Sequence, residues 1–377
     1  MPPGLQSRLG LVNSGVGGFD SHALPPLTPE RDVSLQSTSD SRGDVSLRRY
    51  REGDEVAIVE AFNRIFEAID PGFQPRSMEH WRWEFADNPS GFESWVAETD
   101  EGKIVGQYAA LVQPVLLEGE RATFLHGVDS MTDPAYRRSL AKGGLFARLG
   151  NTFLDHYGGA PPEKIPVIWG PPVPTAWRIG KTQIRYVLIR TQLKLVLEPQ
   201  HLRAAATESS KTVVEEVQDF PVDTEELFTR AADGVGAIIV RNKERMDWRF
   251  FRHPERTYRV LCARRNGELV GYAVSTVGDF DGNKGETVLC DWLVPNGERG
   301  ASAALVEAMA AEAVRSGAPN ITAVLPDTAP AWLDLQESGF RARPTRYLVA
   351  ARVYDPRYRE RWLHRHFYYT LGDMDLI

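Results

Sequence analysis

The chain has 377 residues, of which 44 are Lys or Arg and 51 are Asp or Glu, so its formal net charge is −7. At roughly 100–200 residues per domain, this length predicts two domains, each able to bury its own core. The acidic balance argues against a general polyanion binder, which usually has a basic excess or a basic stripe. Two cysteines, Cys262 and Cys290, are too few for a disulfide framework, and no Cys/His cluster has metal-ligand spacing.

The first 44 residues differ in composition from the rest of the chain. Segments 13–18 and 37–41 are rich in Gly, Ser and Asp, and they bury too little apolar surface to offset the entropy of ordering. We therefore expect residues 1–44 to form a disordered N-terminal extension. The first residues lack the apolar core of a signal peptide, and no stretch reaches the ~18 apolar residues of a membrane span. These features favour a cytoplasmic protein.

Predicted structure starts at residue 45. Residues 45–50 are predicted as a strand, 55–68 as an amphipathic helix, and 78–85 as a short helix. Residues 94–98 and 103–112 flank Asp100-Glu101-Gly102, which is typical of a hairpin turn, and 123–131 is a further strand. A helix follows from about residue 141, because Leu145, Leu149 and Phe153 share one face.

The same order of elements returns about 160 residues later. Strands are predicted at 256–263, 268–276 and 287–294, followed by a helix at 298–316, a strand at 320–325, a short helix at 329–337 and a strand at 347–353. This repetition predicts an α/β protein built from a duplicated unit. We assign residues 45–198 to a first domain, 199–218 to a linker, and 219–377 to a second domain with a C-terminal extension.

Residues 128–146 combine a strand end, a Pro-containing turn, basic residues, glycines and the start of a helix. Unpaired N–H groups and the dipole at a helix N-terminus attract phosphate. Gly143 and Gly144 permit close approach to the backbone, while Arg137, Arg138 and Lys142 add positive charge. The stretch is therefore a candidate phosphate cradle. The alternative is a glycine-capped helix with solvated basic side chains.

This stretch resembles the acetyl-CoA-binding motif of the GNAT N-acyltransferase superfamily. The similar segments are Met-Thr-Asp-Pro-Ala-Tyr-Arg-Arg at 131–138 and Gly-Leu-Phe at 144–146, and 47–54 resembles the first strand and helix entry of such domains. The resemblance implies acetyl-CoA or another acyl-CoA as cosubstrate and no metal. It implies backbone donors for an oxyanion near Ser130 and Met131, and cofactor contacts from Ser130, Met131, Arg137, Arg138, Lys142, Gly143, Gly144 and Leu145.

The second half resembles the same family, at Gly-Glu-Leu-Val-Gly-Tyr-Ala (267–273) and at a late helix that ends in Gly-Phe (331–340). The resemblance implies two tandem GNAT-like domains, each a mixed, mostly antiparallel central sheet flanked by helices. Both cofactor loops depart from the family's Arg/Gln-x-x-Gly-x-Gly/Ala pattern: the first is lengthened between Arg138 and Gly144, and the second places Glu298 at the helix start. A carboxylate at that position would repel a pyrophosphate. We therefore expect the first domain to bind the cofactor and the second to have a structural or substrate-shaping role.

Acyl transfer to an amine needs a base, because an alkyl amine with a pKa near 10.4 is almost fully protonated at pH 7. Asp129 and His126 lie on the strand before the cradle with odd spacing, so that only one faces the cleft. We predict Asp129 as the catalytic base, and Asp291 is a weaker candidate on the second-domain strand. A tyrosine acid for the thiolate is not evident, since Trp177 stands where one is expected and Tyr186 comes later.

The leading hypothesis is an N-acetyltransferase that transfers the acyl group to an amine of a small molecule or amino sugar. The alternative is a non-catalytic acyl-CoA-binding or scaffold protein with two GNAT-like domains. A third hypothesis, an aminoacyl or peptidyl transferase, needs a charged-tRNA partner, and the net charge of −7 counts against it. We expect no nucleic-acid and no membrane partner, and a homo-oligomer is possible.

Overall fold

The computed structural model describes residues 45–69, 72–137, 143–161, 163–203 and 211–376, so the predicted extension 1–44 lies outside the described residues. The first half contains β1 (Val45–Arg49), α1 (Glu55–Glu67), α2 (Met78–Trp81) continued by a π-helical turn (Arg82–Ala86), β2 (Phe92–Thr99), β3 (Ile104–Leu117), β4 (Glu120–Thr132), α3 (Leu145–Tyr157), β5 (Val167–Gly170), α4 (Pro174–Ile179) and β6 (Val187–Leu197).

The second half repeats this order with one additional strand, β8, between its first two helices. It contains β7 (Val213–Val217), α5 (Thr224–Ala232), β8 (Ala237–Ile239), α6 (Lys243–Phe251), β9 (Arg259–Arg265), β10 (Glu268–Phe280), β11 (Asn283–Leu293), α7 (Arg299–Ser316), β12 (Ile321–Ala323), α8 (Pro330–Glu337) and β13 (Arg341–Val353). The chain then adds α9 (Glu360–His366) and β14 (Phe367–Tyr368). The duplication predicted from the sequence is present, although the segment predicted as a linker, 199–218, ends in the strand β7.

Local sequence explains several element boundaries. Asn266 and Gly267 both have positive φ (54° and 86°), as the tight hairpin between β9 and β10 requires. Ser77 and Asn242 cap α2 and α6 by accepting hydrogen bonds from the backbone N–H groups of His80 and Arg245. The helix predicted from about residue 141 begins at Leu145, and residues 138–142 lie outside the described part of the chain.

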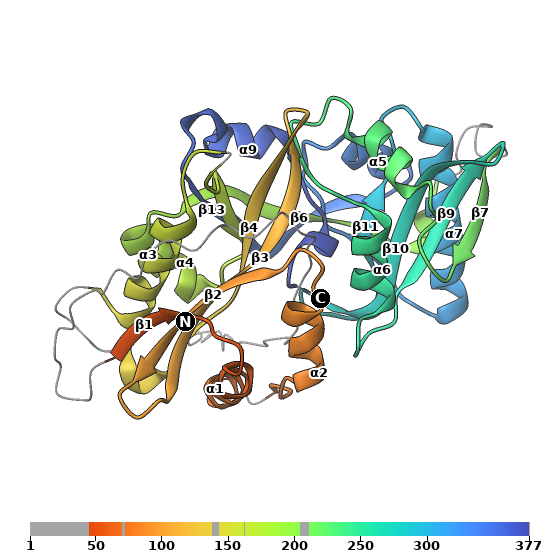
Figure 1. Ribbon diagram of the computed structural model, residues 1–377. Coiled ribbons are helices and arrows are strands. Elements are labelled where there is room, and N and C mark those ends of the chain that lie inside the picture. Colours follow the sequence, from red (N-terminus) through yellow and green to blue (C-terminus); the bar gives the residue numbers. More distant parts are fainter. Residues whose placement is uncertain (1–44, 70–71, 138–142, 162, 204–210, 377) are drawn as a thin grey trace, which may run out of the picture.

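The strands form one continuous sheet that passes through both halves (Figure 1). Its main path is β1-β2-β3-β4-β5-β13-β6-β12-β11-β10-β9-β7, so the strand order of the first half is mirrored by that of the second about the β13–β6 pair. Along this path, neighbouring strands are antiparallel except for one parallel pair in each half, β4–β5 and β11–β12, and off the path β8 and β14 are also parallel. Helices α3 and α4 lie beside the first half and α7 beside the second. The sheet is therefore mixed and mostly antiparallel, as predicted.

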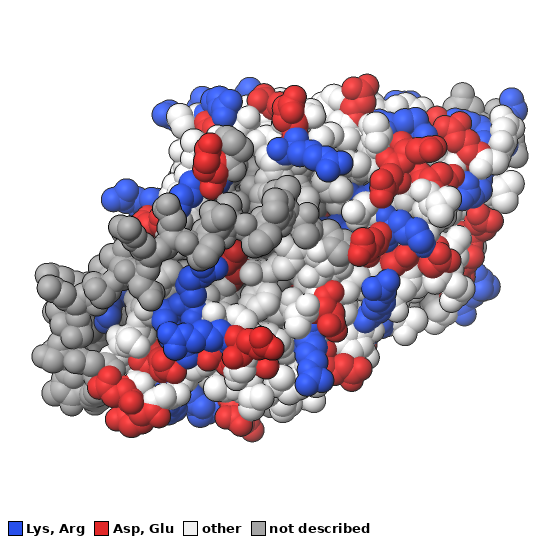
Figure 2. Space-filling view, in the orientation of Figure 1, with Lys and Arg blue, Asp and Glu red and all other residues white. Residues whose placement is uncertain are grey.

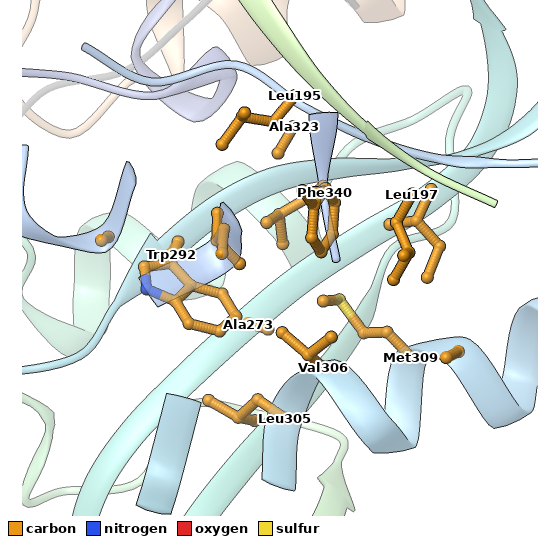
Figure 3. Close-up of a cluster of buried hydrophobic side chains, with 14 of the residues drawn as sticks. Leu195, Leu197, Ala273, Trp292, Leu305, Val306, Met309, Ala323 and Phe340 are labelled. Carbon is orange, nitrogen blue, oxygen red and sulfur yellow. The ribbon is translucent and has the colours of Figure 1, made fainter. Parts of the chain in front are cut away.

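Each half gives its last strand to the other half. β6 pairs with β12 and β13, while β13 pairs with β5, so the pairing crosses the predicted division at residue 198. Leu195 and Leu197 of β6 lie in the same buried cluster as Met309 of α7 and Phe340 (Figure 3). Burial of such apolar side chains stabilises the fold by about 25 cal/mol per Å². The two halves therefore share their cores.

No helix of the described residues is long and apolar enough to cross a membrane. On the face in Figure 2, basic and acidic side chains are interspersed among the described residues, and neither sign forms a continuous stripe there.

Two tryptophans join the halves: Trp83 lies in the π-helical turn that continues α2, and Trp248 lies in α6. The indole rings of Trp83 and Trp248 stack with centroids 4.7 Å apart and planes 9° apart. Trp83 Nε1 donates to the carbonyl oxygen of Trp248 at 3.2 Å, and Trp248 Nε1 donates to that of Trp83 at 3.1 Å. The reciprocal contact follows from a repeated sequence: residues 76–89 and 241–254 match at Arg, Glu, Trp, Phe and Pro positions 165 residues apart.

We expect Trp83→Ala to lower the free energy of unfolding by about 3–5 kcal/mol, because it removes a large buried ring and leaves the indole of Trp248 without its partner. Urea denaturation followed by fluorescence measures this value. Leu333→Ala, at an exposed site of α8, is the control and should change stability by less than about 0.5 kcal/mol. Equal effects of the two changes would contradict the stabilising role of the tryptophan pair.

Candidate active site

The parallel strands β4 and β5 separate after a short paired region. They pair only at Leu125–Ile168 and His126–Trp169, and beyond this point β4 continues while β5 ends at Gly170. Gly127 lies at the start of the gap, where a Cβ atom would come no closer than 3.8 Å to its nearest neighbour, the Trp169 carbonyl oxygen. We call the place where β4 and β5 separate the fork. A cavity of about 1320 Å³ opens there. The absence of a side chain at Gly127 keeps the fork open.

The cavity reaches both faces of the sheet. Tyr108 and Tyr186 line it on the α3 side, where their hydroxyl groups are hydrogen-bonded to each other. Burial raises the pKa of the Tyr186 hydroxyl to about 12. On the α1 side the wall is aromatic: the rings of Phe62 and Phe66 lie 4.4 Å apart, and Phe73 stacks on Phe66 at 5.9 Å.

A buried ion pair lies at the floor of the fork. Arg76, in the segment before α2, pairs through Nη1 with the Asp129 carboxylate, and the same atom lies 3.2 Å from Oε2 of the buried Glu84. Asp129 has a positive φ of 47° and lies in a β-bulge, where Asp129 and Ser130 together face the single residue Tyr108 of β3. The bulge turns the Asp129 side chain into the cavity.

The surroundings of Asp129 favour its protonated form. Burial raises the pKa of the Asp129 carboxyl to about 7, and the negative charges of Glu84 and Asp375 act in the same direction. The guanidinium of Arg76 lowers it, but only in part. A carboxylate with a pKa near 7 is suited to accept a proton at neutral pH.

Two histidines lie next to this cluster. His80 Nδ1 is 2.8 Å from Glu255 Oε2, and its Nε2 is 3.6 Å from Glu84. Burial disfavours protonation of His80, but hydrogen bonds to Glu255 and Glu84 outweigh it and raise its pKa. His126 is fully buried, packs on Trp169, and lies 3.3 Å from the Asp375 carboxylate.

The residues predicted for the site are only partly brought together. Asp129 and Ser130 line the cavity, whereas Met131 and Leu145 are buried in the two cores on opposite faces of the sheet. Gly144 precedes the first residue of α3, and Gly143 before it has a positive φ of 78°. Arg137 is exposed, and its Nε donates to the Thr132 carbonyl oxygen at 3.0 Å. Arg138 and Lys142 lie outside the described residues.

Four other residues considered from the sequence have clear positions. Trp177, on α4, does not line the cavity, whereas Tyr186 does. Cys262 and Cys290 are buried free thiols whose pKa burial raises to about 12, so neither is an activated nucleophile.

Arg76 was not predicted as a site residue. The sequence contained a signal for it, because the Arg that precedes a capped helix recurs as Arg241 in the 165-residue repeat. That signal shows that the position is duplicated, but not that its side chain meets an aspartate 53 residues away.

No protein-family model matches this sequence, and no curated protein matches it. Solved structures match its fold. A GCN5-related N-acetyltransferase from Anabaena variabilis gives a TM-score of 0.59 at 15% identity, over 82% of this chain and 72% of that one. A conserved protein of Enterococcus faecalis, described as a probable N-acyltransferase, gives 0.57 at 13% identity, over 85% and 74%. A tandem GNAT protein from the clavulanic acid biosynthesis pathway gives 0.50 at 14% identity, over 83% and 99%.

The chain has the GNAT fold. This confirms the fold predicted from the resemblance of residues 128–146, and the open fork between β4 and β5 belongs to the first GNAT unit.

The fork of the second GNAT unit is filled by the chain's own C-terminal segment. Gly372 packs so closely that a Cβ atom there would lie 3.1 Å from the Cys290 carbonyl oxygen and 3.2 Å from the Asp291 Cβ. Tyr368 donates from its hydroxyl to the Trp292 carbonyl oxygen at 2.5 Å. The residue two positions before Asp291 is the buried Leu289, whereas Gly127 stands two positions before Asp129.

Asp291 forms an ion pair like that of Asp129, but it lies at the filled fork of the second unit. It lies 3.0 Å from Arg241 Nη2 and accepts hydrogen bonds from the hydroxyls of Tyr272 and Thr370, each at 2.7 Å. Burial opposes its ionisation, but Arg241 and these donors outweigh burial and lower its pKa. The lowered pKa favours the ionised form of Asp291, and Asp291 does not line the cavity at the first fork, so neither observation supports the weaker prediction of Asp291 as a base.

We expect Arg76→Ala to lower the free energy of unfolding by about 3–5 kcal/mol, because it removes the guanidinium that lies between the buried carboxylates of Glu84 and Asp129. Asp129→Asn should preserve or raise stability. Since the folded pKa of Asp129 (about 7) exceeds its ordinary value of 3.8, ionisation of Asp129 costs stability as the pH rises between these two values. The stability of Asp129→Asn relative to the wild type should thus increase with pH over this window.

Chemical denaturation of both variants at several pH values measures these effects. Equal destabilisation by the two substitutions at neutral pH would contradict this account of the cluster.

Proposed function

We propose that the protein is an acyl-CoA-dependent N-acyltransferase that acts on a primary amine of a small molecule, with its active site in the first GNAT unit. The observation that supports this most directly is the open fork between β4 and β5, which leads to a carboxylate with a pKa near 7. In the second unit the same place is closed by Gly372 and Leu289.

The residues of the fork suit an acyl-CoA. Strands that separate leave backbone N–H and C=O groups without a strand partner, and an extended chain such as pantetheine can hydrogen-bond to such groups. The N-terminus of α3, a helix of 13 residues that follows Gly143 and Gly144, would hold the pyrophosphate. When bound, the thioester supplies an activated acyl group.

The residues around the fork can move the protons of the reaction. Asp129 would accept the proton that the amine loses as it attacks the thioester carbonyl. The N–H of Ser130 lies in the bulge, where the ladder with β3 is interrupted, so it is a candidate donor to the oxyanion. Tyr186, on the α3 side, would return a proton to the departing sulfur. A thiolate with a pKa near 8.5 needs little such help, and we assign Asp129 the larger share of the rate.

The non-catalytic alternative predicts cofactor binding without acyl transfer. The position of Asp129 on the wall of the open cavity, together with its raised pKa, supports the enzyme instead.

We expect Gly127→Val to weaken acetyl-CoA binding at least about tenfold, since the valine methyl groups would fill the fork. The folded state should be retained, because the nearest atom to a Cβ there is 3.8 Å away. Isothermal titration calorimetry measures the affinity, and thermal unfolding checks the fold. Glu298→Ala, at the start of α7 in the second unit, is the matched control and should bind acetyl-CoA as the wild type does. Normal binding by Gly127→Val would place the cofactor elsewhere.

We expect kcat/KM for acetyl transfer to rise with pH and to be half-maximal near pH 7, because Asp129 must be ionised to accept a proton. Asp129→Asn should lower kcat by about 10²–10⁴-fold and lose this pH dependence. Asp375→Asn should shift the midpoint to lower pH, since the negative charge of Asp375 raises the Asp129 pKa. Release of free thiol at a series of pH values gives all three profiles. An unchanged profile in Asp129→Asn would rule out Asp129 as the base.

A further inference from the structure

A turn of the second GNAT unit, at 253–256, enters the cavity of the first. His253 Nδ1 accepts hydrogen bonds from the backbone N–H groups of both Glu255 and Arg256, each at 3.1 Å. His253 itself is buried, and its ring lies 4.1 Å from the Trp83 ring. The stacked tryptophans therefore hold this turn in place, and the side chain of Arg256 extends from a backbone that these contacts position.

His253 stays an acceptor over the whole neutral range. Burial lowers its pKa to about 2, and the positive charges of Arg249, His80 and Arg256 act in the same direction. Its neutral imidazole can therefore keep accepting both backbone N–H groups at neutral pH.

Arg256 differs from the other basic side chains that line the cavity. Within the described part of the chain, each of those others has a carboxylate within 4 Å: Arg76 has Asp129 and Glu84, His80 has Glu255 and Glu84, Arg259 has Glu216 and Glu312, and Arg346 has Asp281. Arg256 is half-buried and lines the same cavity, but no described carboxylate pairs with it.

The space around the Arg256 guanidinium is suited to a ligand. Its Nη1 lies beside Gly278 of β10, 3.8 Å from the position that a Cβ would occupy, so no side chain from that residue covers it. A guanidinium presents paired N–H donors that match the two oxygens of a carboxylate or phosphate. A half-buried cation without a counter-ion in a cavity favours an anion there.

We propose that Arg256 binds an anionic group of the acceptor, so that the acceptor is an amine that also bears a carboxylate or phosphate. This proposal rests on the proposed acyl transfer at Asp129. The acceptor then spans the cavity, with its amine at the first GNAT unit and its anion at the second. The phosphates of acyl-CoA are the other source of such an anion. We assign Arg256 to the acceptor, because the N-terminus of α3 in the first unit is available for the pyrophosphate.

The test compares two panels of amines with acetyl-CoA as donor: free amino acids, and the same amino acids as carboxamides. Wild-type protein should show a KM at least about tenfold lower for the free acids, the size expected of one charge-assisted hydrogen bond. Arg256→Ala should raise KM for the acids to the level of the amides and leave the amides unchanged. Arg256→Lys should recover part of the difference, and Arg252→Ala, at an exposed residue outside the cavity, should match the wild type.

Calorimetry with acetyl-CoA separates the two sources of the anion. Unchanged acetyl-CoA affinity in Arg256→Ala supports the acceptor assignment, whereas a tenfold loss would overturn it in favour of the cofactor. Acyl transfer that does not distinguish acids from amides would overturn the inference and leave the proposed function standing. Binding of free acids that depends on Arg256, together with no acyl transfer to any amine, would support the anion site and overturn the proposed function.

Discussion

The structure of both GNAT units depends on one buried ion pair between an arginine that precedes a helix and an aspartate on a central strand. Arg76 joins the α2 segment to Asp129 of β4, and Arg241 joins the α6 segment to Asp291 of β11. Removing either arginine leaves buried carboxylates without its guanidinium, and in the first unit Arg76 serves both Asp129 and Glu84. In each unit the pair fixes the outer helix to the strand that turns away from its parallel neighbour.

The aspartates of the two ion pairs differ in pKa because of the residues around them. The position of Glu84 in the first repeat is that of Arg249 in the second, so Asp129 has an added negative neighbour. Asp291 instead has donors from Tyr272 and from Thr370 of the C-terminal segment. One aspartate therefore titrates near neutral pH beside an open fork, whereas the other remains ionised within a closed one. The two units therefore share the ion pair, and they differ in the charges and donors around it and in the presence of Gly127.

The exchange of final strands explains why the second unit can shape the site of the first. β6 and β13 cross between the halves, and Trp83 and Trp248 stack where α2 and α6 meet. The turn that contains Arg256 is attached to this contact through His253, so it reaches the cavity at the first fork. A cavity lined by both units can hold an acceptor larger than a single unit would enclose.

The sequence by itself determined the order of the elements, the duplication and the stretch that contains the fork, since periodicity and turn residues such as Asn266-Gly267 act over a few positions. It also singled out Asp129 and Ser130, because a strand end before a glycine-containing helix start is a local pattern. Only the tertiary structure decided that Arg76 meets Asp129, that β6 and β13 are exchanged, that Gly372 closes the second fork, and that Arg256 enters the first cavity. Each of these joins segments 53 or more residues apart, and such pairings depend on burial and charge in the folded chain rather than on local sequence.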